Sequence, residues 1–157
     1  AATTVGEETS GRGAYYAARR IKPDCCIAVD VTWASDAPGT DPGDTGEVDL
    51  SGGPVLCRAT AVNKKMNALL EETASQLGIK VQFEVAAGHT GTDGDTVNRA
   101  CEGVPMALVS IPLRYMHSSV EVGSWKDIEE CIELLAGFIV RLSKELEKGF
   151  DFCPVRV

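Results

Sequence analysis

The sequence predicts an α/β fold in which helices cover both faces of a mostly parallel sheet. Apolar segments with the length and composition of strands alternate along the chain with segments of helical periodicity, an order that is typical of α/β proteins. Two of the strand segments, residues 25–31 and 105–111, are almost continuously apolar, as strands are when both faces of the sheet are covered. A chain of 157 residues is about one domain long.

The predicted elements follow one another in a regular order. Strands are expected at residues 2–5, 25–31, 54–59, 81–85 and 105–111. Helices are expected at residues 12–21, 63–77, 95–102 and 124–146, of which the last begins with a pattern like a capping box at Ser124 and Asp127. Residues 32–53 form a loop rich in Gly, Pro and Asp, and loops of this length in compact domains are usually functional or disordered. Residues 150–157 form either a final edge strand or a loose end.

Composition excludes two classes of partner. The net charge is −8 without a cluster of Lys or Arg, so we expect no nucleic-acid binding. No run of about eighteen apolar residues is present, so we expect no membrane span, and no basic and apolar leader precedes Ala1, so we expect no secretion signal.

The chain contains six cysteines, Cys25, Cys26, Cys57, Cys101, Cys131 and Cys153. None of them forms a C-x-x-C motif. We expect them to be reduced thiols of a cytoplasmic protein.

Polar residues follow several of the predicted strands. Glu7 and Glu8 come after the first strand, Asp30 ends the second, the segment 91–93 follows the fourth, and His117 follows the fifth. The carboxyl ends of parallel strands meet at one edge of an open sheet, so we expect these groups to converge there. Two carboxylates and an imidazole are a normal ligand set for zinc or cobalt, and one further carboxylate could act as a base on water.

Each of these residues also has an ordinary structural interpretation. The acidic pair could complement the positive end of a helix dipole, Asp30 could cap a loop, and a lone His is often structural. The surplus of carboxylates could also serve only to keep the surface soluble.

Several motifs in order extend through nearly the whole chain. They are Thr4–Glu8 followed by Gly11–Ala14, then Ala28–Thr32, Ala34–Gly39, Gly91–Asp93, Gly103–Pro105 and Arg114–Ser118. Together they resemble the glutamyl and deblocking aminopeptidases, metallopeptidase family forty-two, whose members have also been called endoglucanase M. The chain departs from the family at Thr9–Gly11, where an apolar residue, Gly and Leu are usual.

The resemblance implies a three-layer αβα sandwich of the zinc-peptidase type and hydrolytic removal of N-terminal residues from peptides with two divalent ions, zinc or cobalt. It implies that Glu7 is the general base, that Glu8 and His117 are ligands near one metal, and that Asp30 is a ligand of the other. Asp93, Arg114 and Tyr115 match positions near the substrate. The family also forms large homo-oligomers.

The same resemblance implies that the site is incomplete. In the family, an upstream half supplies a further metal-binding His, the Asp that bridges the two metals, and an inserted dimerisation domain. Only seven residues precede Glu8, so we expect residues 1–157 to be the carboxyl-terminal portion of a catalytic domain that binds metal weakly and has little activity by itself. It would be part of a longer enzyme or a remnant of one.

Two other functions remain open. Paired carboxylates serve glycoside hydrolysis, but Glu7 and Glu8 are sequence neighbours, so one must turn away from the other unless the backbone bends. A non-catalytic role in assembly or binding is the second alternative.

Overall fold

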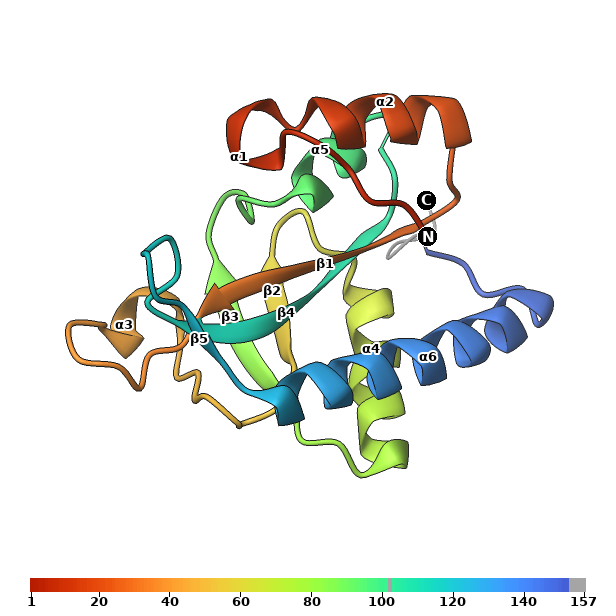
Figure 1. The fold of residues 1–157 in the computed structure, drawn as a ribbon. Helices are drawn as coiled ribbons and strands as arrows, with labels where there is room; N and C mark the ends of the chain where they lie inside the picture. The colour runs from red at the N-terminus through yellow and green to blue at the C-terminus, as the bar shows by residue number, and fades with distance from the viewer. Residues whose placement is uncertain (102, 153–157) are drawn as a thin grey trace.

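The computed structural model describes residues 1–101 and 103–152 (Figure 1). The strands are β1 (Cys26–Trp33), β2 (Val55–Ala59), β3 (Gln82–Ala86), β4 (Met106–Arg114) and β5 (Val122–Gly123). The helices are α1 (Glu7–Ser10), α2 (Arg12–Ile21), α3 (Pro42–Thr45), α4 (Lys64–Leu77), α5 (Asp93–Arg99) and α6 (Trp125–Glu147). Of the terminal segment expected at residues 150–157, residues 153–157 lie outside the described part of the chain.

The strands form one mixed sheet in the order β1-β4-β2-β3, with β5 beside β4. β1 and β4 are parallel from Cys26 opposite Met106 to Trp33 opposite Leu113, and β2 and β3 form a second parallel pair. The two pairs run in opposite directions, because β2 and β4 are antiparallel. The predicted α/β class and the mostly parallel sheet are therefore confirmed.

Helices cover both faces of this sheet. α4 and α6 pack together on one face, and α5 packs on β1 and β4 of the other face with α2 outside it (Figure 1). Successive side chains of β4 point to opposite faces of the sheet, as strand geometry requires. Val109 belongs to the core beneath α4 and α6, whereas Leu108 belongs to a smaller cluster on the opposite face. On that side Gly94 of α5 lies against Ala28 and Met106. The arrangement is a three-layer αβα sandwich.

The first predicted strand is wrong. Residues 2–5 have no strand partner among the described residues, and Val5 is 79% exposed. The Gly13 amide donates to the Val5 carbonyl oxygen at 3.1 Å, so this segment lies against the start of α2 instead of joining the sheet. β4 continues through Pro112 to Arg114, beyond the end expected at residue 111. At Pro112 the strand has only β1 as its neighbour, since β2 pairs up to Ser110 and β5 from Leu113, and such half-paired stretches tolerate proline.

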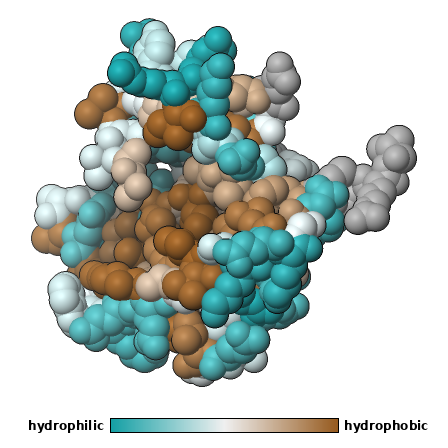
Figure 2. All heavy atoms as spheres, turned by 90° about the vertical axis from the view of Figure 1, so that its right-hand side faces the viewer, coloured by the Kyte–Doolittle hydropathy of each residue, from teal (hydrophilic) through white to brown (hydrophobic). Residues whose placement is uncertain are grey.

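One edge of β1, which has no strand beside it among the described residues, lies in an apolar hollow. β1 is the last strand of the sheet on its side, and a hollow of about 880 Å³ beside it is lined by side chains that include Ile21 of α2, Val29 of β1 and Ile139 of α6. All three side chains are more than half exposed. Figure 2 shows hydrophobic side chains gathered over this face of the molecule. Among residues 1–101 and 103–152, no helix has both the length and the apolar character needed to cross a membrane.

Candidate functional site

Four of the residues predicted from the sequence line one cavity of about 420 Å³. They are Glu7 and Glu8 from α1, Asp30 from β1, and His117 from the loop after β4. The cavity wall also includes Trp33 at the end of β1. Side chains that are more than a hundred residues apart in the sequence therefore share one polar cavity.

Glu8 and His117 lie next to each other in this cavity. The His117 Nε2 atom lies 3.4 Å from the Glu8 Oε1 atom, and both side chains are more than half exposed. The His117 imidazole and the Trp33 indole are nearly perpendicular, with the ring centroids 6.1 Å apart. A nitrogen and a carboxylate oxygen at this separation can bind one proton or one cation between them.

Glu7 and Asp30 belong to a cluster of like charges. Burial raises the pKa of Glu7 most, and the nearby carboxylates of Asp30, Glu8 and Asp93 raise it further. The pKa of Asp30 is raised by burial first and then by Asp93 and Glu8, although the Val31 amide donates to Asp30 Oδ1 at 2.8 Å and opposes the shift. Repelling carboxylates of this kind are typical of sites that bind a cation or a proton.

The three predicted substrate residues do not line this cavity. Asp93, at the start of α5, lines an adjoining hollow with Glu7 and accepts a hydrogen bond from Thr4. Its Oδ1 atom is buried without a hydrogen-bond partner in the described structure. The guanidinium group of Arg114 is directed instead at Asp36, and Tyr115 is part of the turn that carries His117.

The groups converge for a different reason from the one predicted. Asp30 lies inside β1, not at its end, and β3 runs opposite to β1 and β4, so the strand ends do not share one edge. Asp93 reaches the cluster because α5 returns across β1. The cavity therefore lies along the face of the sheet that α5 covers.

Glu84 is a cavity residue that the sequence interpretation missed. It lies on β3, where Thr32 Oγ1 donates to its Oε2 atom and Ser110 Oγ donates to its Oε1 atom at 3.1 Å. Burial raises the pKa of Glu84, and Asp30 raises it further. Residues 81–85 alternate between apolar and polar side chains, a pattern that predicts a strand with Gln82 and Glu84 on a wetter face. Gln82 is instead buried and Glu84 is half-buried, and two long polar side chains at alternate positions of one strand were the available signal.

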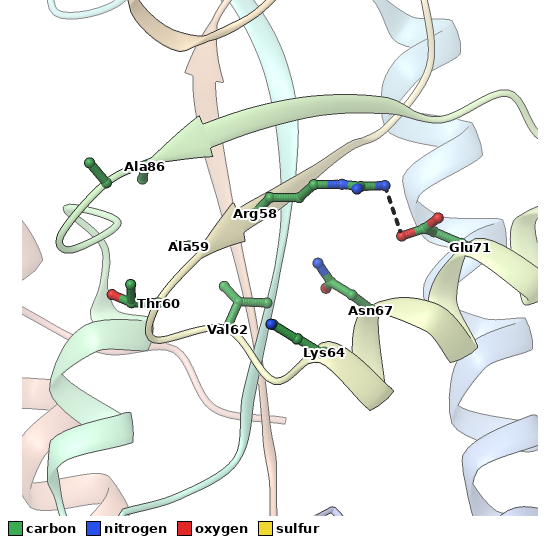
Figure 3. Close-up of a pocket in the computed structure, with 9 residues that line it drawn as sticks. Arg58, Ala59, Thr60, Val62, Lys64, Asn67, Glu71 and Ala86 are labelled. Carbon is green, nitrogen blue, oxygen red and sulfur yellow. Dashed lines mark hydrogen bonds and ion pairs between the residues drawn. The ribbon is translucent and has the colours of Figure 1, made fainter. Parts of the chain in front are cut away.

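A separate hollow of about 550 Å³ lies between β2, β3 and α4 (Figure 3). None of the predicted site residues lines it. Its guanidinium group, on Arg58, is 3.4 Å from Glu71 and lies over the Phe83 ring at 4.2 Å. Because this cation is already paired within the chain, the acidic cavity is the better candidate for chemistry.

The donor set fits part of a metal site. Glu8 and His117 offer an oxygen and a nitrogen that can face one ion, and Asp30 offers another carboxylate nearby. Within the described ranges, however, no three His, Cys, Asp or Glu side chains are close enough together to hold an ion by themselves. The assignment of metal ligands therefore stays a prediction.

The family model for M42 glutamyl aminopeptidases matches residues 1–134. This chain belongs to the M42 aminopeptidase family. The family resemblance proposed from the motifs is thereby confirmed. It extends over the segments that carry Glu7, Glu8, Asp30 and His117.

Similar proteins share both the sequence and the fold of this M42 chain. The lysyl aminopeptidase of Pyrococcus furiosus is 36% identical over 153 residues, which cover 96% of this chain and 41% of the relative. The crystal structure of the TET aminopeptidase of Thaumarchaeota archaeon SCGC AB-539-E09 matches with a TM-score of 0.85 and 31% identity, over 95% of this chain and 42% of that one.

A third similar protein is the TET1 peptidase of Pyrococcus horikoshii, which can assemble into a tetrahedron or a large octahedral shell. It matches with a TM-score of 0.65 and 25% identity, over 85% of this chain and 38% of that one. The M42 chain thus spans about two fifths of the length of these proteins.

Proposed function

We propose that this M42 chain is part of a metal-dependent aminopeptidase that hydrolyses N-terminal residues from peptides. The observation that carries the proposal is the approach of His117 Nε2 to Glu8 Oε1, at 3.4 Å, in a cavity that also contains Glu7 and Asp30. In this proposal Glu8 and His117 hold one divalent ion, zinc or cobalt, and Asp30 holds a second. Divalent ions at these ligands would supply the Lewis acidity that polarises the scissile carbonyl group.

Glu7 is proposed as the general base. It takes a proton from the attacking water, the water oxygen bonds to the carbonyl carbon, and the proton passes to the nitrogen as the C–N bond breaks. A carboxylate whose pKa is raised by burial and by neighbouring acids is a stronger base than an exposed one, and Glu7 has this environment. Asp93, Arg114 and Tyr115 remain proposed as residues near the substrate.

The complete site is proposed to include residues beyond these 157, which would form the carboxyl-terminal portion of the catalytic domain. Catalytic metal sites usually have three protein ligands for each zinc ion, and Glu8 with His117 provides two. The chain spans about two fifths of its relatives. The open β1 edge and its apolar hollow support the same proposal, because proteins normally cover a long edge strand.

Peptide substrates, a homo-oligomeric assembly and a cytoplasmic location complete the proposal. The assemblies of the Pyrococcus horikoshii TET1 peptidase support the oligomer by analogy. The five described cysteines are free thiols, as is usual for cytoplasmic proteins.

Hydrolysis of aminoacyl-p-nitroanilides tests this function. The full-length protein should lose activity when 1,10-phenanthroline removes its metal and recover it with zinc or cobalt, whereas residues 1–157 alone should show little activity. Strong activity of residues 1–157 would contradict the incomplete site. Chelator-resistant hydrolysis of cellulose would favour the glycosidase alternative, and a full-length protein without hydrolytic activity would favour a non-catalytic role.

A further inference from the structure

A bidentate ion pair between Arg114 and Asp36 lies at the start of the turn that carries His117. Arg114 is the last residue of β4, and its Nε and Nη2 atoms donate to the two carboxylate oxygens of Asp36 at 2.9 and 2.6 Å. Such paired geometry restricts orientation more than a single contact does. The pKa of Asp36 is lowered, with the hydrogen bond from Arg114 as its largest cause.

Asp36 is itself fixed by the loop between β1 and β2. The Leu50 amide donates to Asp36 Oδ2 at 3.1 Å. Next to it, the Ser35 amide donates to the Val48 carbonyl oxygen at 2.7 Å, and Val48 is fully buried. Asp36 therefore joins both ends of this loop to the end of β4. Its carboxylate is held in place by the loop, so it can fix the position of the Arg114 side chain.

The turn beyond Arg114 has an unfavourable backbone. Tyr115 and His117 have φ angles of 60° and 61°, in the left-handed region that residues other than glycine rarely adopt. Residues stay in such conformations only where the surrounding structure holds them, and they gather at functional sites. On its far side the turn is closed by the His117 amide, which donates to Glu121 Oε1 at 2.7 Å, and by the Ser118 amide, which donates to the Tyr115 carbonyl oxygen. On its near side the Arg114–Asp36 pair holds it.

We infer that Asp36, acting through Arg114, is a positioning residue that keeps the His117 imidazole against Trp33 and within reach of Glu8. A turn released at Arg114 can relax its two left-handed residues, and the imidazole then leaves its place 3.4 Å from Glu8. The consequence for metal binding rests on the proposed function, whereas the placement of the ring does not. In this account Arg114 shapes the site through its ion pair with Asp36.

Nuclear magnetic resonance on the 157-residue chain tests the placement directly. Asp36→Asn and Arg114→Lys should each weaken the Overhauser contact between the His117 ring and the Trp33 indole at least twofold and speed exchange of the Ser118 amide at least tenfold. The control is Asp41→Asn, which alters an acid of the same loop that caps α3 through Gly43 and has no contact with Arg114. It should leave both readouts unchanged.

Two variants keep the inference falsifiable if one fails to fold. Arg114→Lys keeps the positive charge and removes the bidentate pair of hydrogen bonds. If the ion pair only stabilised the fold, this variant would change stability without moving the His117 ring. An unchanged Overhauser contact in whichever variant folds would overturn the inference. Zinc titration of the same proteins adds the functional arm: loss of a supporting partner typically weakens metal affinity by about tenfold or more. If the wild-type chain binds no zinc, the prediction of weak zinc binding by residues 1–157 is wrong, and the ring contact alone still decides the positioning role.

Discussion

Replacing Asp127 with alanine should lower the free energy of unfolding by about 3 kcal/mol. The side chain is fully buried in the first turn of α6. Its two oxygens accept from the Ser51 amide at 2.8 Å and from the Gly53 amide at 2.9 Å. A hydrogen bond to a charged group contributes about 1.5–3 kcal/mol. We use the lower value for each bond, because water can reach the partly buried Ser51 amide after the substitution.

Urea unfolding followed by far-ultraviolet circular dichroism measures this change. The matched control is Glu129→Ala on the same helix, which removes an exposed carboxylate whose one hydrogen-bond partner in the described part of the chain is the Trp125 indole. Surface substitutions of that kind usually change stability by about 0.5 kcal/mol or less. A loss for Asp127→Ala that is no larger than the loss for Glu129→Ala would refute the reasoning.

Two further predictions concern the cavity and the segment that leads to it. The pKa of Glu84 is raised above its ordinary value of 4.5, so the folded chain binds this proton more tightly than the unfolded chain, and the resulting stability is lost as pH rises through the folded pKa. Glutamine does not titrate, so Glu84→Gln should not lose this stability as the pH rises. The free energy of unfolding of the variant relative to wild type, measured in urea, should therefore be higher at pH 7 than at pH 4. A difference between the two proteins that is independent of pH would contradict this. Gly13→Ala would place a Cβ atom 2.4 Å from the Val5 amide nitrogen, so it should cost about 1–3 kcal/mol and displace Glu8. The control Gly88→Ala, whose Cβ atom would meet nothing within 4 Å, should change neither stability nor the His117 resonances.

The sequence predicts most elements well because their signals are local. The stripe of apolar residues in residues 124–146 corresponds to α6 (Trp125–Glu147), and the continuous apolar run at residues 105–111 corresponds to most of β4 (Met106–Arg114). The opposed directions of the two strand pairs depend on contacts between distant segments, which periodicity does not contain. Residues 2–5 have the composition of a strand, but α2 is their neighbour.

Contacts between residues that are far apart in the sequence also explain why the environments of Asp127 and Glu84 could not be predicted. Asp127 matches a capping box with Ser124, yet Ser124 makes no side-chain cap, and Asp127 bonds the loop at Ser51 and Gly53 instead. Glu84 has the alternation of a surface strand residue, and only the approach of Thr32 and Ser110 makes it a cavity residue. The motifs led to Glu8 and His117, which the structure brings together, while their chemical roles stay predictions.

Calorimetric titration of zinc into the 157-residue chain tests the central claim most directly. The chain has two histidines: His117 beside Glu8, and His89, whose largely exposed side chain lies 4.0 Å from Asp95. We predict weak zinc binding that Glu8→Gln and His117→Ala each abolish and that His89→Ala leaves intact. Zinc binding that survives both Glu8→Gln and His117→Ala, or that is lost in His89→Ala, would contradict the account.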